Sequence, residues 1–196
     1  MRPVPTTEIR WHARGGQGAK TAAVLLAEAA AAAGKYVQGF PEYGPERMGA
    51  PMLAFNRIGD EPIYVYSGVK NPRVVIVLDP TLVGKSDVTA GLPDDGVILI
   101  NTAREPAEMR ARLKLPPGKG KVFTVDASRI SLDTLGRDIP NTPMMGALMR
   151  AAGLIAYEQF LQVTEEQLHH KFRNRPELVD ANVKAIRRGY EEVRGE

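Results

Sequence analysis

Glycine recurs three times within four residues in the stretch Trp11-His12-Ala13-Arg14-Gly15-Gly16-Gln17-Gly18-Ala19-Lys20-Thr21, which separates strand-forming residues from an alanine-rich segment. The glycines let the backbone turn sharply and bring its N–H groups close to a ligand. The helix expected after Gly18 points its partially positive N-terminus at the same place. Arg14 and Lys20 add full positive charges. The stretch therefore predicts a strand–loop–helix unit that receives a phosphate or another anion.

The loop differs from both common nucleotide-binding motifs. A dinucleotide fingerprint that starts at Gly16 needs a sixth-position glycine, where this chain has Thr21. A P-loop ending in Lys20-Thr21 needs glycines where the chain has Arg14 and Ala19. A tight turn whose glycines serve packing alone is the alternative, so the loop by itself does not identify the ligand.

Composition limits the classes of protein to which the chain can belong. Its 196 residues suit a single domain, expected to span residues 1–196. The net charge of +3 is small and the cations are interspersed with acids, which argues against a nucleic-acid-binding surface. Without cysteine the chain cannot hold a cluster through thiolates or form a disulfide.

Nothing in the sequence indicates export or a membrane span. The apolar stretch from Ala22 to Ala33 is too short and contains Glu28. Pro3 and Pro5 interrupt any apolar region near the start, as a signal peptide would not allow. We therefore expect a cytoplasmic protein without a membrane partner.

Apolar runs predict an α/β fold with one open, mostly parallel sheet and helices on both faces. Asp79, Asn101 and Asp126 directly follow three such runs, as expected where ligands lie beyond the carboxyl ends of the strands. An antiparallel hairpin of residues 52–58 with 62–66 is expected at one edge. The other expected elements are strands over 8–12, 36–40, 74–78, 97–100 and 122–125, and helices over 19–33 and 105–113.

The last third of the chain is expected to be helical. Thr142-Pro143 opens one helix, and Thr164 with Gln167 forms a capping box for a short second one. Pro176 opens a final helix with one apolar face. The predicted apolar stripes are Met145, Leu148, Met149, Ala152 and Ile155 in the first helix, and Val179, Val183, Ile186, Tyr190 and Val193 in the last.

The sequence contains no complete catalytic set. His169 and His170 lie on a polar segment typical of a solvated face, and no histidine–carboxylate group has the spacing of a metal site. His12 ends the first expected strand, where a hydrogen bond near a ligand and a structural role are equally compatible with its position. The chain also lacks the Gly-Asp-Gly motif of thiamine diphosphate enzymes. An anion-binding loop without catalytic groups indicates a binding subunit of a larger assembly.

The chain resembles the gamma subunit of the 2-oxoacid:ferredoxin oxidoreductases, the group that includes pyruvate:ferredoxin oxidoreductase. The resemblance covers nearly the whole chain. It is carried by Arg14–Gly18 with its alanine-rich helix, by Phe40–Arg47 followed by Gly49–Pro51, by Leu78–Leu82, and by Asn141 with Gly146.

The resemblance implies a part in the oxidative decarboxylation of a 2-oxoacid such as pyruvate to an acyl-CoA, with electrons passing to ferredoxin. Thiamine diphosphate, Mg²⁺ and the [4Fe-4S] clusters would belong to alpha, beta and delta-type partner subunits. The hypothesis for this chain is that coenzyme A phosphates are held by a set of loop residues, namely Arg14, Gly15, Gly16, Gln17, Gly18 and Lys20.

The proline-rich loop from Pro41 to Pro51 is a second candidate. Glu42, Tyr43, Glu46 and Arg47 lie in a segment too rigid for a plain connection. They are interpreted as facing partner subunits or the channel to the thiamine site, with bracing of the glycine loop as the alternative. A stand-alone nucleotide-binding α/β protein is the alternative for the whole chain.

Overall fold

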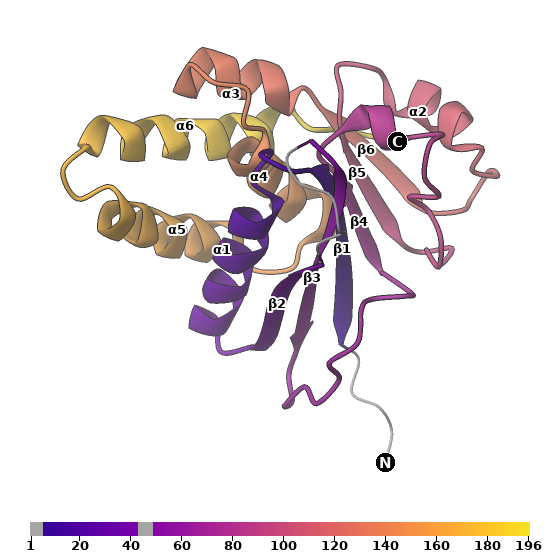
Figure 1. Ribbon diagram of the computed structural model, residues 1–196, viewed down its shortest axis with the longest axis horizontal. Helices are drawn as coiled ribbons and strands as arrows, with labels where there is room; N and C mark the ends of the chain where they lie inside the picture. The colour runs from indigo at the N-terminus through magenta and orange to yellow at the C-terminus, as the bar shows by residue number, and fades with distance from the viewer. Residues whose placement is uncertain (1–5, 43–48) are drawn as a thin grey trace.

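A seven-stranded sheet with the order β2-β3-β1-β4-β5-β6-β7 runs through the computed structural model, which describes residues 6–42 and 49–196 (Figure 1). Strands β1, β4, β5 and β6 are parallel neighbours, whereas β3 and β7 run against them. Since β2 is antiparallel to β3, it shares the direction of the central strands. The predicted open, mostly parallel sheet is confirmed. The strands are β1 (Thr7–Arg14), β2 (Tyr36–Glu42), β3 (Pro51–Gly59), β4 (Val74–Val77), β5 (Val97–Asn101), β6 (Lys121–Val125) and β7 (Arg194–Gly195).

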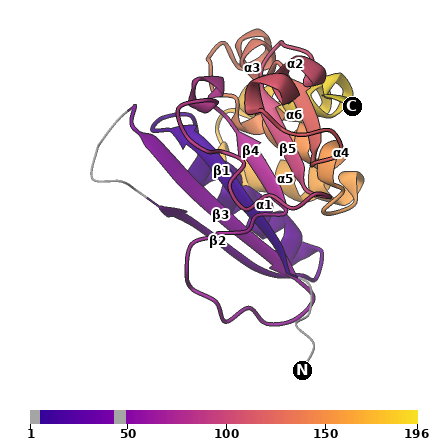
Figure 2. The same ribbon diagram turned by 90° about the vertical axis from the view of Figure 1, so that its right-hand side faces the viewer.

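Helices cover both faces of the sheet, as predicted (Figure 2). Helices α1 and α4 pack on one face, with α3, α5 and α6 beside them, and α2 lies on the other face with the 3-10 turn η1. No described helix is both long and apolar enough to cross a lipid bilayer. The helical elements are α1 (Ala19–Ala32), η1 (Pro80–Leu82), α2 (Pro106–Leu113), α3 (Ala127–Leu135), α4 (Asn141–Ala152), α5 (Tyr157–Lys171) and α6 (Pro176–Glu192).

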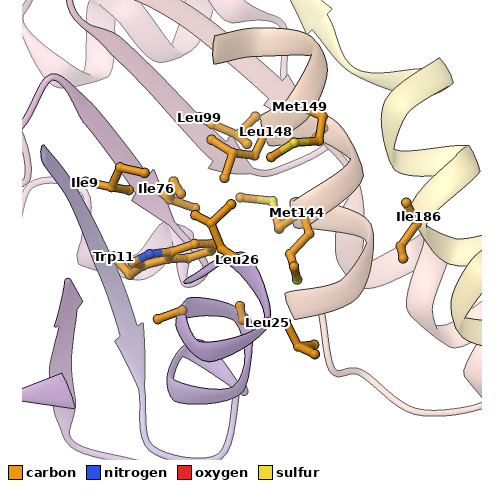
Figure 3. Close-up of a cluster of buried hydrophobic side chains, with 14 of the residues drawn as sticks. Ile9, Trp11, Leu25, Leu26, Ile76, Leu99, Met144, Leu148, Met149 and Ile186 are labelled. Carbon is orange, nitrogen blue, oxygen red and sulfur yellow. The ribbon is translucent and has the colours of Figure 1, made fainter. Parts of the chain in front are cut away.

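Alternation along β1 decides which side chains enter the main core. Ile9 and Trp11 face α1 and α4, where Trp11 packs near Leu26 and Met144 (Figure 3). The Trp11 indole N–H donates to the Asn56 Oδ1 atom at 2.8 Å, so its polar atom is satisfied in the core. The alternate residues of β1, which include Arg10, His12 and Arg14, point to the opposite face.

The antiparallel pair at one edge is present, but its predicted partner segment was wrong. Strand β3 pairs with β2 and not with residues 62–66, which form no strand. The backbone of this segment is held by side chains instead of a ladder. The Arg57 Nη1 atom donates to the Val65 carbonyl at 3.2 Å, and the Gln38 Nε2 atom donates to the Ile63 carbonyl at 3.2 Å. Pro62 lacks an N–H, which further disfavours pairing.

The C-terminal third is helical as predicted, with two corrections. Helix α4 ends at Ala152 because Gly153 adopts a left-handed φ of +57°, so Ile155 lies beyond the predicted stripe. Thr164 does not cap a short helix, since α5 already begins at Tyr157 and Thr164 is buried in its middle. Helix α3, which the sequence did not predict, begins where the Asp126 carboxylate accepts from a backbone N–H.

Candidate functional site

The glycine loop between β1 and α1 is a tight turn tied to the start of β3. Gly15 donates its N–H to the Ala50 carbonyl at 3.1 Å, and Gly16 and Gly18 have φ values of +100° and +83°. A Cβ atom on Gly18 would lie 2.6 Å from the Asn141 Nδ2 atom, so only glycine fits there. No side chain of the described residues caps α1, which leaves the N–H groups of its first turn open.

Arg14 and Gln17 form a polar network with Asp79 at the carboxyl end of β4. The Arg14 Nε atom lies 2.9 Å from the Asp79 Oδ2 atom, and the Gln17 Nε2 atom donates to the same oxygen at 3.3 Å. The Arg14 Nη1 atom also donates to the Gly49 carbonyl at 3.0 Å, so Arg14 links the loop to the start of β3. The network fixes the loop conformation.

The network also keeps the Asp79 carboxylate charged. Burial alone would raise its pKa, but hydrogen bonds from Thr81, the charge of Arg14 and the Gln17 amide together hold the pKa below its ordinary value. The other Asp79 oxygen accepts from the Thr81 N–H at 2.8 Å and caps η1. Part of the Arg14 charge is therefore neutralised within the protein.

A cavity of about 480 Å³, called here the glycine-loop cavity, opens at the N-terminus of α1. Its walls come from the glycine loop, the α3–α4 connection, the end of α5 and the start of α6, and the glycine loop lies more than 100 residues before the other three segments in the sequence. The lining residues are Gly16, Gly18, Thr21, Leu25, Leu135, Arg137, Ile139, Asn141, Thr142, Leu168, Lys171, Phe172, Arg175, Leu178 and Asn182.

Three buried polar side chains, from Asn141, Thr142 and Asn182, form one part of this wall. The Asn141 Oδ1 atom accepts from the Thr142 N–H at 2.8 Å, which turns its Nδ2 atom toward Gly18. That Nδ2 atom makes one long hydrogen bond, to the Gly18 carbonyl at 3.5 Å. The Asn182 Nδ2 atom donates to the Leu178 carbonyl at 2.7 Å. Asn141 therefore retains amide N–H capacity beside the open end of α1.

His12 lines two further cavities, of about 420 and 280 Å³, on the other face of the sheet. Its Nε2 atom accepts from the Arg10 Nε–H at 3.0 Å. Burial, followed by the charge of Arg10, lowers the pKa of His12 to about 4, while Asp87 acts in the opposite direction. His12 is therefore neutral at physiological pH and positions the buried Arg10 guanidinium.

Lowering the pH from 7 to 4 is expected to destabilise the fold by on the order of 3 kcal/mol through His12. Between about pH 6.5 and pH 4 the unfolded imidazole binds a proton that the folded one resists. The stability contribution is thus lost as the pH falls through this window. Urea denaturation at a series of pH values measures it. His12→Gln keeps a hydrogen-bond acceptor without titrating, and a pH dependence identical to that of the unmodified chain would contradict this assignment.

The structure brings together only part of the predicted site. Gly16 and Gly18 line the glycine-loop cavity, whereas Lys20 is exposed in the first turn of α1 and does not. Glu42 ends β2 and lines both His12 cavities. Tyr43, Glu46 and Arg47 lie outside the described residues. Among residues 6–42 and 49–196, no group of three or more histidine or acidic side chains could hold a metal ion.

Comparison with known proteins identifies the family. The family model described as pyruvate ferredoxin/flavodoxin oxidoreductase matches residues 8–192. The chain belongs to this family. The resemblance found in the sequence is thereby confirmed.

Three proteins illustrate what this family member is similar to. The crystal structure of pyruvate oxidoreductase subunit PORC from Thermotoga maritima is 48% identical with a TM-score of 0.85, over 97% of this chain and 98% of that one. The pyruvate/ketoisovalerate oxidoreductases common subunit gamma of Pyrococcus furiosus is 46% identical, over 95% of this chain and 96% of the relative. The 2-oxoglutarate:ferredoxin oxidoreductase from Magnetococcus marinus, solved with 2-oxoglutarate, coenzyme A and succinyl-CoA bound, shares the fold, with a TM-score of 0.73 at 21% identity over 95% of this chain and 30% of that longer chain.

The cavity of this oxidoreductase family member includes residues that the sequence did not single out as a site. Arg137, Lys171, Arg175 and Asn182 come from four separate places in the last third of the chain. The basic run from Lys171 to Arg175, directly before the helix-opening Pro176, was the one local signal that could have found part of this set.

Proposed function

We propose that the chain is the gamma subunit of a 2-oxoacid:acceptor oxidoreductase and accommodates coenzyme A at its glycine loop. The similarity to a pyruvate oxidoreductase subunit over 97% of the chain is the observation that carries this proposal. A chain without cysteine cannot hold iron–sulfur clusters through thiolates, so cluster-bearing and thiamine-bearing partner subunits of alpha, beta and delta type must supply the redox chemistry. Ferredoxin is the proposed acceptor, and the cytoplasm the proposed location.

The glycine loop fits the phosphates of coenzyme A. The open N–H groups of the first turn of α1 and the N-terminus of that helix favour an anion, and within residues 6–42 and 49–196 no acidic side chain lines the cavity. A volume of about 480 Å³ lies within the range of small-molecule sites. We assign contact with phosphate to the backbone of Gly15–Gly18. Arg14 and Gln17 position that backbone through Asp79, and Lys20 attracts the anion from the surface.

Pyruvate is the 2-oxoacid that the relatives support best. The Thermotoga maritima relative is a pyruvate oxidoreductase subunit, and the Pyrococcus furiosus relative is common to pyruvate and ketoisovalerate oxidoreductases. A gamma subunit shared by two oxidoreductases implies that other subunits select the oxoacid. We propose the same division here, with Glu42 at the end of β2 and Tyr43 and Arg47 after it facing those subunits.

Arg14→Ala is expected to raise the KM for coenzyme A by about tenfold in the assembled oxidoreductase, with the KM for pyruvate unchanged. The reason is that the glycine loop loses its connection to Asp79, and hydrogen bonds to charged groups contribute about 1.5–3 kcal/mol. Steady-state kinetics of the complex co-purified with its partner subunits measures the effect. Arg129→Ala, which removes an exposed ion pair on α3, is the matched control. An unchanged KM for coenzyme A would refute the assignment.

The same preparation tests the proposal as a whole. The chain expressed alone is expected to show no pyruvate oxidation and to co-purify with thiamine-bearing and cluster-bearing subunits when these are present. Turnover by the isolated chain would overturn the proposal. Tight binding of a nucleotide other than coenzyme A by the isolated chain would favour the stand-alone nucleotide-binding protein instead.

A further inference from the structure

We infer that Arg137, Lys171 and Arg175 form a subsite for the 3′-phosphate of coenzyme A within the glycine-loop cavity. This inference rests on the proposed function and adds to it a set of specificity-determining residues. The three cations belong to the α3–α4 connection, the last residue of α5 and the residue before α6. They therefore reach one cavity from three separate segments of the chain.

The charge balance of the cavity points to an anionic ligand. Among the described residues, its lining contains these three cations and no aspartate or glutamate. Arg175 does pair with Glu177 at 3.3 Å, but both side chains are more than half exposed, and such pairs contribute little. Lys171 lies over the Phe172 ring, with its Nζ atom 5.5 Å from the ring centroid. All three cations are exposed, so water screens their mutual repulsion, and an anion that contacts them together would gain charge-assisted hydrogen bonds.

The cavity has a second, neutral donor group distinct from the cations. Asn141 is 93% buried, since only 7% of its surface is exposed, and its amide nitrogen makes one long bond of 3.5 Å to the Gly18 carbonyl. Beside it lie the open N–H groups at the start of α1. This amide nitrogen and the helix terminus thus form a set of neutral donors. The same cavity also has the three cationic side chains Arg137, Lys171 and Arg175.

Coenzyme A carries phosphate of two kinds, which matches these two kinds of donor. Its pyrophosphate resembles the groups that helix N-termini bind through backbone N–H groups. Its 3′-phosphate is a monoester with a higher charge, for which guanidinium and ammonium groups are the usual partners. Leu168, Phe172 and Leu178 give the same cavity apolar surface suited to an adenine ring. We therefore assign the pyrophosphate to the glycine loop with Asn141, and the 3′-phosphate to the three cations.

The test compares coenzyme A with 3′-dephospho-coenzyme A on the complete complex. Isothermal titration calorimetry is expected to show that the unmodified complex binds coenzyme A about 10 to 100 times more tightly. In the triple variant Arg137→Gln, Lys171→Gln and Arg175→Gln this preference is expected to disappear. Between the unmodified complex and the triple variant, the dissociation constant for 3′-dephospho-coenzyme A should change by less than about twofold. This ligand has no 3′-phosphate, so it makes no contact that the substitutions could remove.

A matched triple variant controls for loss of charge. Lys85→Gln, Arg112→Gln and Lys114→Gln remove three exposed cations on the opposite side of the sheet and should leave the preference intact. A preference that survives in the cavity variant would overturn the inference, as would an equal loss of affinity for both ligands. If the Arg14→Ala complex loses affinity for coenzyme A while the cavity variant does not, the subsite fails and the proposed function stands. If the unmodified complex binds no coenzyme A, both fail.

Discussion

Gly189→Ala is expected to lower the free energy of unfolding by about 3 kcal/mol, although alanine is the better helix former. Gly189 in α6 lies against α4, where an added Cβ atom would be 2.0 Å from the Pro143 carbonyl oxygen. Gly146 in α4 makes the reciprocal approach, 2.0 Å from the Ile186 carbonyl oxygen. The clash is with backbone atoms, so a rotamer change cannot relieve it and the helices must separate.

Helix propensity and the backbone clash predict opposite changes in the free energy of unfolding for Gly189→Ala. Intrinsic helix propensity alone would make Gly189→Ala more stable by about 1 kcal/mol. Urea denaturation of the chain distinguishes gain from loss. Gly153→Ala is the control, because its φ of +57° is strained for alanine but nothing lies within 4 Å of the added Cβ atom. That control should lose about 1–2 kcal/mol, as expected for left-handed backbone alone. Stabilisation by Gly189→Ala would contradict the close crossing of α4 and α6.

The sheet was predictable because each central strand is a continuous apolar run that ends in a polar residue. Val74–Val77 is buried on both faces, as its sequence indicates, and Asp79 then caps η1 as expected of a carboxylate in that place. Residues 62–66 are also rich in strand-forming residues, yet they form no strand. The Arg57 and Gln38 side chains hold this segment, and a contact with a side chain from another strand leaves no periodic signal in the segment itself.

The glycine loop was predictable from local chemistry, whereas most of the cavity was not. Gly16 and Gly18 stand out because their spacing and the following helix have a physical meaning at short range. Arg137 and Arg175 reach the same cavity only through the packing of α3, α5 and α6. In the sequence these two arginines cannot be distinguished from arginines on any other part of the surface. Asn141 was marked by the family resemblance alone, and its approach to Gly18 depends on how α4 packs on α1.

Arg57→Ala is expected to have the largest effect on stability, a loss of about 3–5 kcal/mol, because the buried guanidinium makes several charge-assisted hydrogen bonds to partly buried acceptors. Only 3% of the Arg57 side chain is exposed. Its Nε atom lies 2.7 Å from a Glu8 carboxylate oxygen, and its Nη2 atom donates to the Ser67 carbonyl at 2.7 Å. The Arg57 Nη1 atom also donates to the Val65 carbonyl, so one guanidinium joins β3 to β1 and to the segment that follows β3.

Two measurements separate the ion pair from the anchoring of the segment. Arg73→Ala removes an equally short pair with Asp95, but more than half of each side chain is exposed, so a loss below about 1 kcal/mol is expected. Chymotrypsin should cleave Arg57→Ala faster near Tyr64 and Tyr66, which are already exposed, because the backbone between them is released. Cleavage at the rate of the unmodified chain would show that the segment is held by other contacts.

A double variant decides which part of the Arg57 interaction matters more. Arg57→Met with Glu8→Gln removes both charges, so no unpaired carboxylate remains beside the core. Part of the lost stability should return, but the carbonyls of Val65 and Ser67 still lack their donors. We therefore expect the double variant to remain less stable than the unmodified chain and to stay sensitive to chymotrypsin. Full recovery of stability would mean that the stability contributed by Arg57 comes from its charge pair with Glu8 and not from its bonds to the segment after β3.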